Sequence, residues 1–127
     1  MAKILIVEDD ADLVETYVDL LEAKGYATIS AVSVADAIQL AVSEEPSIVI
    51  LDLALPGGSG VSVLDFIRSH ERLRNTRILV ISGRTEMANL GLADKADIIL
   101  TKPVSNEQLV SMIDRLLRQS GDKNLSG

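Results

Sequence analysis

The feature that most constrains the fold is an uninterrupted apolar run, Ile48 to Leu51, that ends directly in the carboxylate of Asp52. A turn-forming stretch with Pro56 and several glycines follows at once. A short apolar run between turn signals is typical of a strand buried on both faces. Because a lone buried carboxylate is costly, we expect Asp52 at the end of this strand, with partners.

The rest of the chain alternates strands with helices. Strands are predicted at 4–7, 26–31, 48–51, 78–81 and 97–100, and apolar residues at helical spacing predict helices at about 11–24, 34–44, 61–70 and 106–118. Residues 84–95 contain Gly91, so any helix there is short. This alternation predicts an α/β fold, a doubly wound five-stranded parallel sheet of flavodoxin-like order 2-1-3-4-5, with helices on both faces.

Composition narrows the function. The 127 residues suit one domain, predicted at 1–119, with 120–127 as a flexible tail or linker remnant. The net charge of −7 and the three aromatic residues argue against direct nucleic-acid binding. The N-terminal apolar run is too short for a signal peptide or a membrane span, so we expect a cytoplasmic protein without membrane contact.

Polar residues follow the carboxyl ends of four predicted strands. These are Glu8 and Asp9, Asp52, Ser82, and Lys102. Since ligands of such sheets bind at the carboxyl ends of the strands, we expect these side chains to converge on one edge.

The chemistry of this set indicates a phosphoryl site. Carboxylates about 4 Å apart repel by roughly 4 kcal/mol per pair at an effective dielectric constant of ~20, so the acids require a cation. Oxygen ligands without His or Cys favour Mg²⁺. A carboxylate nucleophile, a divalent cation, a lysine and a hydroxyl together suit transfer of a phosphoryl group.

The chain resembles the response-regulator receiver domains of two-component signalling, over residues 3 to about 119. The motifs that carry the resemblance are Ile6-Val7-Glu8-Asp9, Ile50-Leu51-Asp52-Leu53-Ala54-Leu55-Pro56-Gly57-Gly58-Ser59-Gly60, Val80-Ile81-Ser82-Gly83 and Thr101-Lys102-Pro103. Each motif alone is weak, but their order and their place at strand ends make the set specific.

The resemblance implies a role for each residue. Asp52 would accept a phosphoryl group from a sensor histidine kinase or a phosphotransfer protein. Asp9, Asp52 and the backbone carbonyl of Ala54 would bind Mg²⁺, as would Glu8, directly or through water. Ser82 and Lys102 would contact the phosphoryl oxygens, and the Lys102–Pro103 peptide bond would be cis. The domain would switch contacts with a downstream protein or an attached output domain.

The chain departs from the family pattern in its predicted switch region. Ile99 occupies the position where relatives usually carry Tyr or Phe, and Val104 stands where Phe often follows the Lys-Pro pair. The interval from Ser82 to Lys102 is about two residues short. Ala54 and Arg84 occupy positions where relatives tune dephosphorylation.

Alternative interpretations remain open from the sequence. Asp10, more than Asp9, suits an N-cap of the first helix, and the glycines after Asp52 suit a turn rather than a phosphate-binding loop. A receiver-like binding module without phosphorylation is one alternative function. A Mg²⁺-dependent phosphohydrolase is another, but it would want an acid at the position of Ala54.

Overall fold

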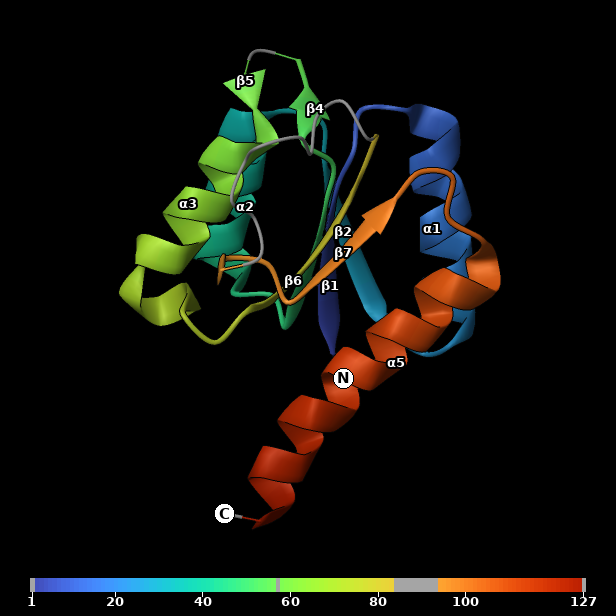
Figure 1. Ribbon diagram of the computed structural model, residues 1–127, viewed down its shortest axis with the longest axis vertical. Coiled ribbons are helices and arrows are strands. Elements are labelled where there is room, and N and C mark those ends of the chain that lie inside the picture. Colours follow the sequence, from blue (N-terminus) through green and yellow to red (C-terminus); the bar gives the residue numbers. More distant parts are fainter. Residues whose placement is uncertain (1, 57, 84–93, 127) are drawn as a thin grey trace.

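A five-stranded parallel sheet forms the centre of the computed structural model, which describes residues 2–56, 58–83 and 94–126, with side chains up to residue 118. The order β2-β1-β3-β6-β7 is the predicted one, because β4 and β5 form a separate hairpin (Figure 1). The five strands are β1 Lys3–Val7, β2 Ala27–Ala31, β3 Ile48–Leu51, β6 Arg77–Ser82 and β7 Ile98–Thr101.

Helices cover both faces of the sheet, as predicted for a doubly wound fold. Helices α1 and α5 pack on one face, and α2 and α3 pack on the other (Figure 1). Their bounds are α1 Ala11–Ala23, α2 Val34–Glu44, α3 Gly60–Ser69 and α5 Asn106–Ser126.

Strand β1 shows why the central strands are apolar throughout. Ile4 and Ile6 point into the core beneath α1 and α5, whereas Leu5 and Val7 point into the core beneath α2 and α3. All four are fully buried. A strand with helices on both sides has no solvent face, so its sequence reads as one apolar run.

The N-cap of α1 determines which of the acids after β1 remains available at the edge of the sheet. The side chain of Asp10 accepts hydrogen bonds from the backbone N–H groups of Asp12 and Leu13, so Asp10 is the N-cap, as predicted. At the other end Gly25 follows the C-cap Lys24 with φ of +91°, a conformation that favours glycine. Asp9 therefore precedes the cap and is not part of it.

Three features differ from the sequence-based expectation or extend it. Two short elements were not predicted. One is the hairpin of β4 Ala54–Leu55 with β5 Gly58–Ser59, and the other is the 3₁₀ helix η1 Glu71–Leu73. Helix α5 continues to Ser126, where a flexible tail was expected, because extending a formed helix costs little. The division at residue 119 stays a prediction.

The short helix expected over residues 84–95 lies for the most part outside the described residues. Within the described part of the chain, no helix is both long enough and apolar enough to cross a membrane.

Candidate functional site

Three acids from two adjacent strands meet at the carboxyl edge of the sheet. Asp52 directly follows β3, and Glu8 and Asp9 directly follow β1. Because β1 and β3 pair side by side, with Val7 opposite Leu51, the three carboxylates are brought within 4.8 Å of one another. Glu8 and Asp52 are 3 % and 5 % exposed, while Asp9 is open to solvent.

A lysine and a serine from two further strands complete the site. Ser82 ends β6 and Lys102 follows β7. Lys102 Nζ lies 2.7 Å from Asp52 Oδ2 and 3.0 Å from Glu8 Oε1, and the fully buried Ser82 Oγ donates to Asp52 Oδ1 at 3.0 Å. The structure thus brings together the side chains that the sequence predicts at strand ends.

Backbone groups fix the orientation of the two buried carboxylates. The N–H of Ala54 donates to Asp52 Oδ1 at 3.0 Å, and the N–H groups of Asp9 and Asp10 each donate to Glu8 Oε2 at 3.1 Å. Both oxygens of Asp52 therefore have donors, and both are held in place before any ligand binds. That the carbonyl of Ala54 binds a metal stays a prediction.

Burial and charge shift the ionisation of this cluster. Burial is the main reason why the pKa of Glu8 lies above its ordinary value, and the nearby charge of Asp52 adds to the effect. Burial alone would lower the pKa of Lys102, but its hydrogen bonds to Asp52 and Glu8 outweigh burial and raise that pKa. The lysine is therefore firmly protonated and neutralises part of the negative charge.

Two features of the site were not predicted. Glu8 was expected only as a metal ligand, yet it also accepts a hydrogen bond from Lys102. Gly60 was assigned only to the turn before α3, yet its N–H donates to the carbonyl of Leu53 at 2.8 Å and it lies against the backbone of Asp52. The glycine-rich stretch after Asp52 was the available signal for this close approach.

Two residues that depart from the family pattern lie in β7 and shortly after it. Ile99 is 37 % exposed on the outer strand β7, and Val104 packs against the core formed with α1 and α5. The Lys102–Pro103 peptide bond is cis, as predicted. Arg84 lies outside the described residues.

Comparison with known proteins identifies this arrangement. The family model for the response regulator receiver domain matches residues 4–114. The chain belongs to this family. Receiver domains of response regulators are signalling switches that interact with histidine kinases and output domains.

Relatives of known name are longer regulators. The chain is 36 % identical over 92 % of its length to the transcriptional regulatory protein GltR of Pseudomonas aeruginosa, and 30 % identical over 92 % to the phosphate regulon transcriptional regulatory protein PhoB of Escherichia coli. These matches cover 49 % of GltR and 52 % of PhoB. The chain therefore spans about half the length of these curated relatives.

Solved structures agree with the receiver fold. The signal receiver domain of a LuxO repressor protein from Vibrio parahaemolyticus matches with a TM-score of 0.87 and 26 % identity, covering 98 % of this chain and 96 % of that chain. The response regulator TrrA from Thermotoga maritima, in complex with Mg²⁺ and BeF, matches with a TM-score of 0.82 and 26 % identity, covering 91 % and 99 %.

Proposed function

We propose that this receiver domain accepts a phosphoryl group on Asp52. The observation that carries the proposal is the environment of that carboxylate, with Lys102 at 2.7 Å on one oxygen and Ser82 at 3.0 Å on the other. In the reaction an Asp52 oxygen attacks the phosphorus of a phosphohistidine, and the bond between phosphorus and the imidazole nitrogen breaks. The acyl phosphate stays on Asp52, and the imidazole leaves with the electron pair of the broken bond.

The donor set around Asp52 fits Mg²⁺. Three carboxylates within 4.8 Å provide hard oxygen ligands, and one of them, Asp9, faces solvent, from which the ion and its waters enter. Asp9 and Asp52 would bind the ion directly, Glu8 directly or through water, and Ala54 through its carbonyl. The bound ion would neutralise negative charge on the phosphoryl oxygens.

Lys102 and Ser82 would hold the phosphoryl group. Lys102 already reaches Asp52, so a short movement of its flexible side chain brings Nζ to a phosphoryl oxygen attached there. The Ser82 hydroxyl, now donating to Asp52, would turn its hydrogen to another phosphoryl oxygen. Both residues give up an interaction with Asp52 for one with its phosphorylated form, and this exchange is the start of the switch.

An apolar recess beside Lys102 suits the donor protein. Leu13 and Tyr17 of α1 line it together with Lys102, Pro103 and Val104, around a volume of about 390 Å³. A sensor histidine kinase or phosphotransfer protein that covers this recess would bring its histidine next to Asp52 and exclude water from the reaction.

The consequence of phosphorylation is a change in protein contacts. The domain would act as a phosphorelay switch in the cytoplasm, turning over no other substrate, and would signal to a downstream protein or to an attached output domain. GltR and PhoB are transcriptional regulators of about twice this length, which supports an output in transcription. Direct nucleic-acid binding by this acidic domain itself is not expected.

Incubation with acetyl phosphate and Mg²⁺ tests the proposal by intact-mass spectrometry. We expect one added phosphoryl group on the wild-type chain and none on the Asp52→Asn variant. No gain in mass, under conditions that label a known receiver domain, would favour a binding module that is not phosphorylated. Release of inorganic phosphate over many turnovers would favour a phosphohydrolase instead.

A further inference from the structure

Asp97 joins the beginning of β7 to the beginning of β6 in two ways. Its backbone N–H donates to the carbonyl of Ile78 at 2.9 Å, and its side-chain Oδ2 accepts from the N–H of Ile78 at 2.7 Å. One residue thus satisfies both backbone groups of Ile78. Asp97 directly precedes β7, and its carboxylate accepts the hydrogen bond that a backbone carbonyl of a paired strand would otherwise accept.

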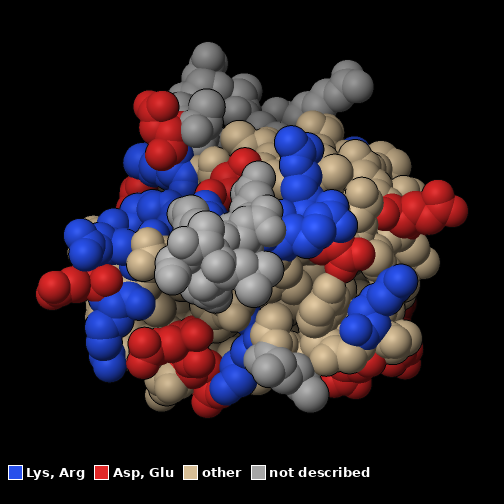
Figure 2. All heavy atoms as spheres, turned by 90° about the horizontal axis from the view of Figure 1, so that it is seen from below, with Lys and Arg blue, Asp and Glu red and all other residues tan. Residues whose placement is uncertain are grey.

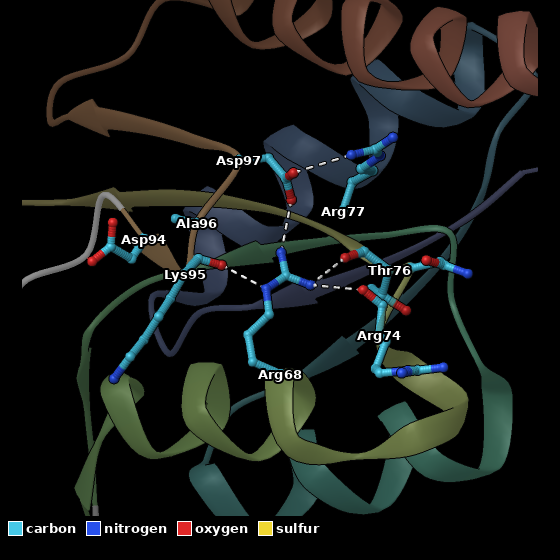
Figure 3. Close-up of a pocket in the computed structure, with 9 residues that line it drawn as sticks. Arg68, Arg74, Thr76, Arg77, Asp94, Lys95, Ala96 and Asp97 are labelled. Carbon is cyan, nitrogen blue, oxygen red and sulfur yellow. Dashed lines mark hydrogen bonds and ion pairs between the residues drawn. The ribbon is translucent and has the colours of Figure 1, made fainter.

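Two arginines hold this carboxylate in position. Arg68 of α3 donates through Nη2 to Asp97 Oδ2 at 2.8 Å, and Arg77 of β6 donates through Nη1 to Oδ1 at 3.3 Å (Figure 3). Arg68 also donates to the carbonyl oxygens of Lys95 at 2.6 Å and Thr76 at 2.8 Å. The guanidinium therefore ties α3, the start of β6 and the residues before β7 together.

This cluster is a partly exposed ion-pair network and not an open basic surface. The side chains of Arg68, Arg77 and Asp97 are between 20 % and 25 % exposed. Basic and acidic side chains lie side by side over this end of the molecule, which faces the viewer in Figure 2. The carboxylate of Asp97 thus neutralises part of the positive charge of the two arginines, and the hydrogen bonds of this network join elements within the protein.

Strand β7 benefits from such an anchor because its own sequence specifies its register only in part. It is an outer strand of the described sheet, and three of its four residues, Ile98, Ile99 and Leu100, are similar aliphatic side chains. Ile98 and Leu100 face the core, while Ile99 is 37 % exposed. A shift by one residue would bring Ile99 and either Asp97 or Thr101 to the core face, so one of the two core positions would keep an aliphatic side chain and hydrophobic burial specifies the register only in part.

The register of β7 determines where Lys102 lies. In the observed register Thr101 pairs with Ser82, and the N–H of Lys102 donates to the carbonyl of Ser82 at 2.9 Å. A shift by one residue would move Lys102 by about 3.3 Å along the strand and turn it to the other face. Because its side chain would then leave the face on which it meets Asp52, the 2.7 Å ion pair would be lost.

We propose that Asp97, held by Arg68 and Arg77, is a positioning residue that fixes the register of β7 and thereby places Lys102 at the phosphoacceptor. The anchor and the site lie at opposite ends of β6 and β7, and the two strands connect them. The proposal rests on the proposed function only in that phosphorylation of Asp52 is one of its readouts.

The phosphorylation rate tests this proposal in a double-mutant cycle with Lys102. With acetyl phosphate and saturating Mg²⁺, we expect Asp97→Ala to be about tenfold slower than wild type, with partial rescue by Asp97→Asn. Asp97→Ala should add less than about twofold to the loss caused by Lys102→Met, because both changes remove the same interaction. A full tenfold loss in the Lys102→Met background, or a wild-type rate for Asp97→Ala, would overturn the proposal.

Two further measurements separate positioning from general loss of structure. The Mg²⁺ dissociation constant depends on acids after β1 and β3, and displacing Lys102 takes a positive charge away from them, so Asp97→Ala should bind Mg²⁺ as tightly as wild type or more tightly. Asp94→Ala is the matched control, because Asp94 is exposed, lines the same cavity as Asp97 and makes no hydrogen bond or ion pair with a described residue. Asp94→Ala should phosphorylate at the wild-type rate. Mg²⁺ binding weakened in parallel with the rate would overturn the positioning role.

The register itself can be read without phosphorylation. Cross-strand nuclear Overhauser contacts between Ser82 and Thr101 should be present in wild type and Asp94→Ala and lost or shifted in Asp97→Ala. A wild-type chain that accepts no phosphoryl group would contradict the proposed function alone, and these contacts would then decide the inference. Unchanged contacts in Asp97→Ala would overturn it.

Discussion

A Cβ atom at Gly60 would lie 2.4 Å from the carbonyl oxygen of Asp52 and 2.6 Å from the Cα of Leu53. The first residue of α3 is therefore in direct contact with the backbone that carries the candidate phosphoacceptor. Only a residue without a side chain allows the two segments to approach so closely. The atoms in the way are backbone atoms, which cannot turn aside as the end of a flexible side chain can.

We predict that Gly60→Ala destabilises the protein by about 2 kcal/mol, because the added methyl group forces the backbone at Asp52 and Leu53 to move. The free energy of unfolding from urea denaturation measures the effect. Gly58→Ala is the control: its Cβ would meet the side chain of Val34, at 3.3 Å from Cγ2 and 4.0 Å from Cβ, and should cost less than about 1 kcal/mol. Equal losses for the two variants would contradict the contact as the cause.

Replacing Lys102 by Met should destabilise the metal-free protein by about 2 kcal/mol, since Glu8 and Asp52 would remain as buried acids without their shared cation. The lysine side chain is 32 % exposed, so we expect less than the loss of a fully buried pair. Lys3→Met is the matched control, because the ion pair of Lys3 with Glu44 is more exposed and should contribute less than about 1 kcal/mol. Chemical denaturation in EDTA compares them.

Magnesium should raise the free energy of unfolding of the wild-type chain by about 2.7 kcal/mol at a hundredfold excess over its dissociation constant. The physical reason is that the ion relieves repulsion among Glu8, Asp9 and Asp52. A melting curve recorded at increasing Mg²⁺ measures the shift. In the Asp9→Ala variant the shift should be strongly reduced, and an equal shift in both proteins would place the bound ion elsewhere.

The convergence of the site could be predicted from sequence because it depends only on the order of elements. In a parallel sheet every strand ends at the same edge, so residues after strands, such as Asp9, Asp52 and Lys102, meet there whatever the details of packing. The N-cap of α1 could also be predicted, since Asp10 accepts hydrogen bonds from backbone N–H groups only two and three residues further along the chain. Local chemistry and topology were sufficient for these features.

Features that depend on exact distances between remote segments could not be predicted. The contact of Gly60 with Asp52 requires the path of the hairpin β4–β5, and the anchoring of Asp97 by Arg68 joins residues 29 positions apart through side chains on the surface of the fold. From a sequence alone, such charged residues are interpreted as ordinary solvent-exposed positions. Their roles depend on strand register, which the largely aliphatic pattern of β7 specifies only in part.

The hydrogen bond from the Tyr26 hydroxyl to Asp114 Oδ1, 2.5 Å long, makes stability depend on pH above neutrality. This bond, which only the protonated phenol can make, raises the pKa of Tyr26 to about 12 from an ordinary value of 10. The folded state thus holds the phenol proton more tightly than the unfolded state, so the contribution of this hydrogen bond to stability is complete below pH 10 and is lost between pH 10 and about 12.

Tyr26→Phe should therefore lower the free energy of unfolding by about 1 kcal/mol at pH 7, and the difference from wild type should disappear towards pH 12. Urea denaturation from pH 7 to 12 measures this difference, and Asp114→Asn should bring the phenol pKa back towards 10. A constant difference across the whole range would show that Tyr26 stabilises the fold by packing alone.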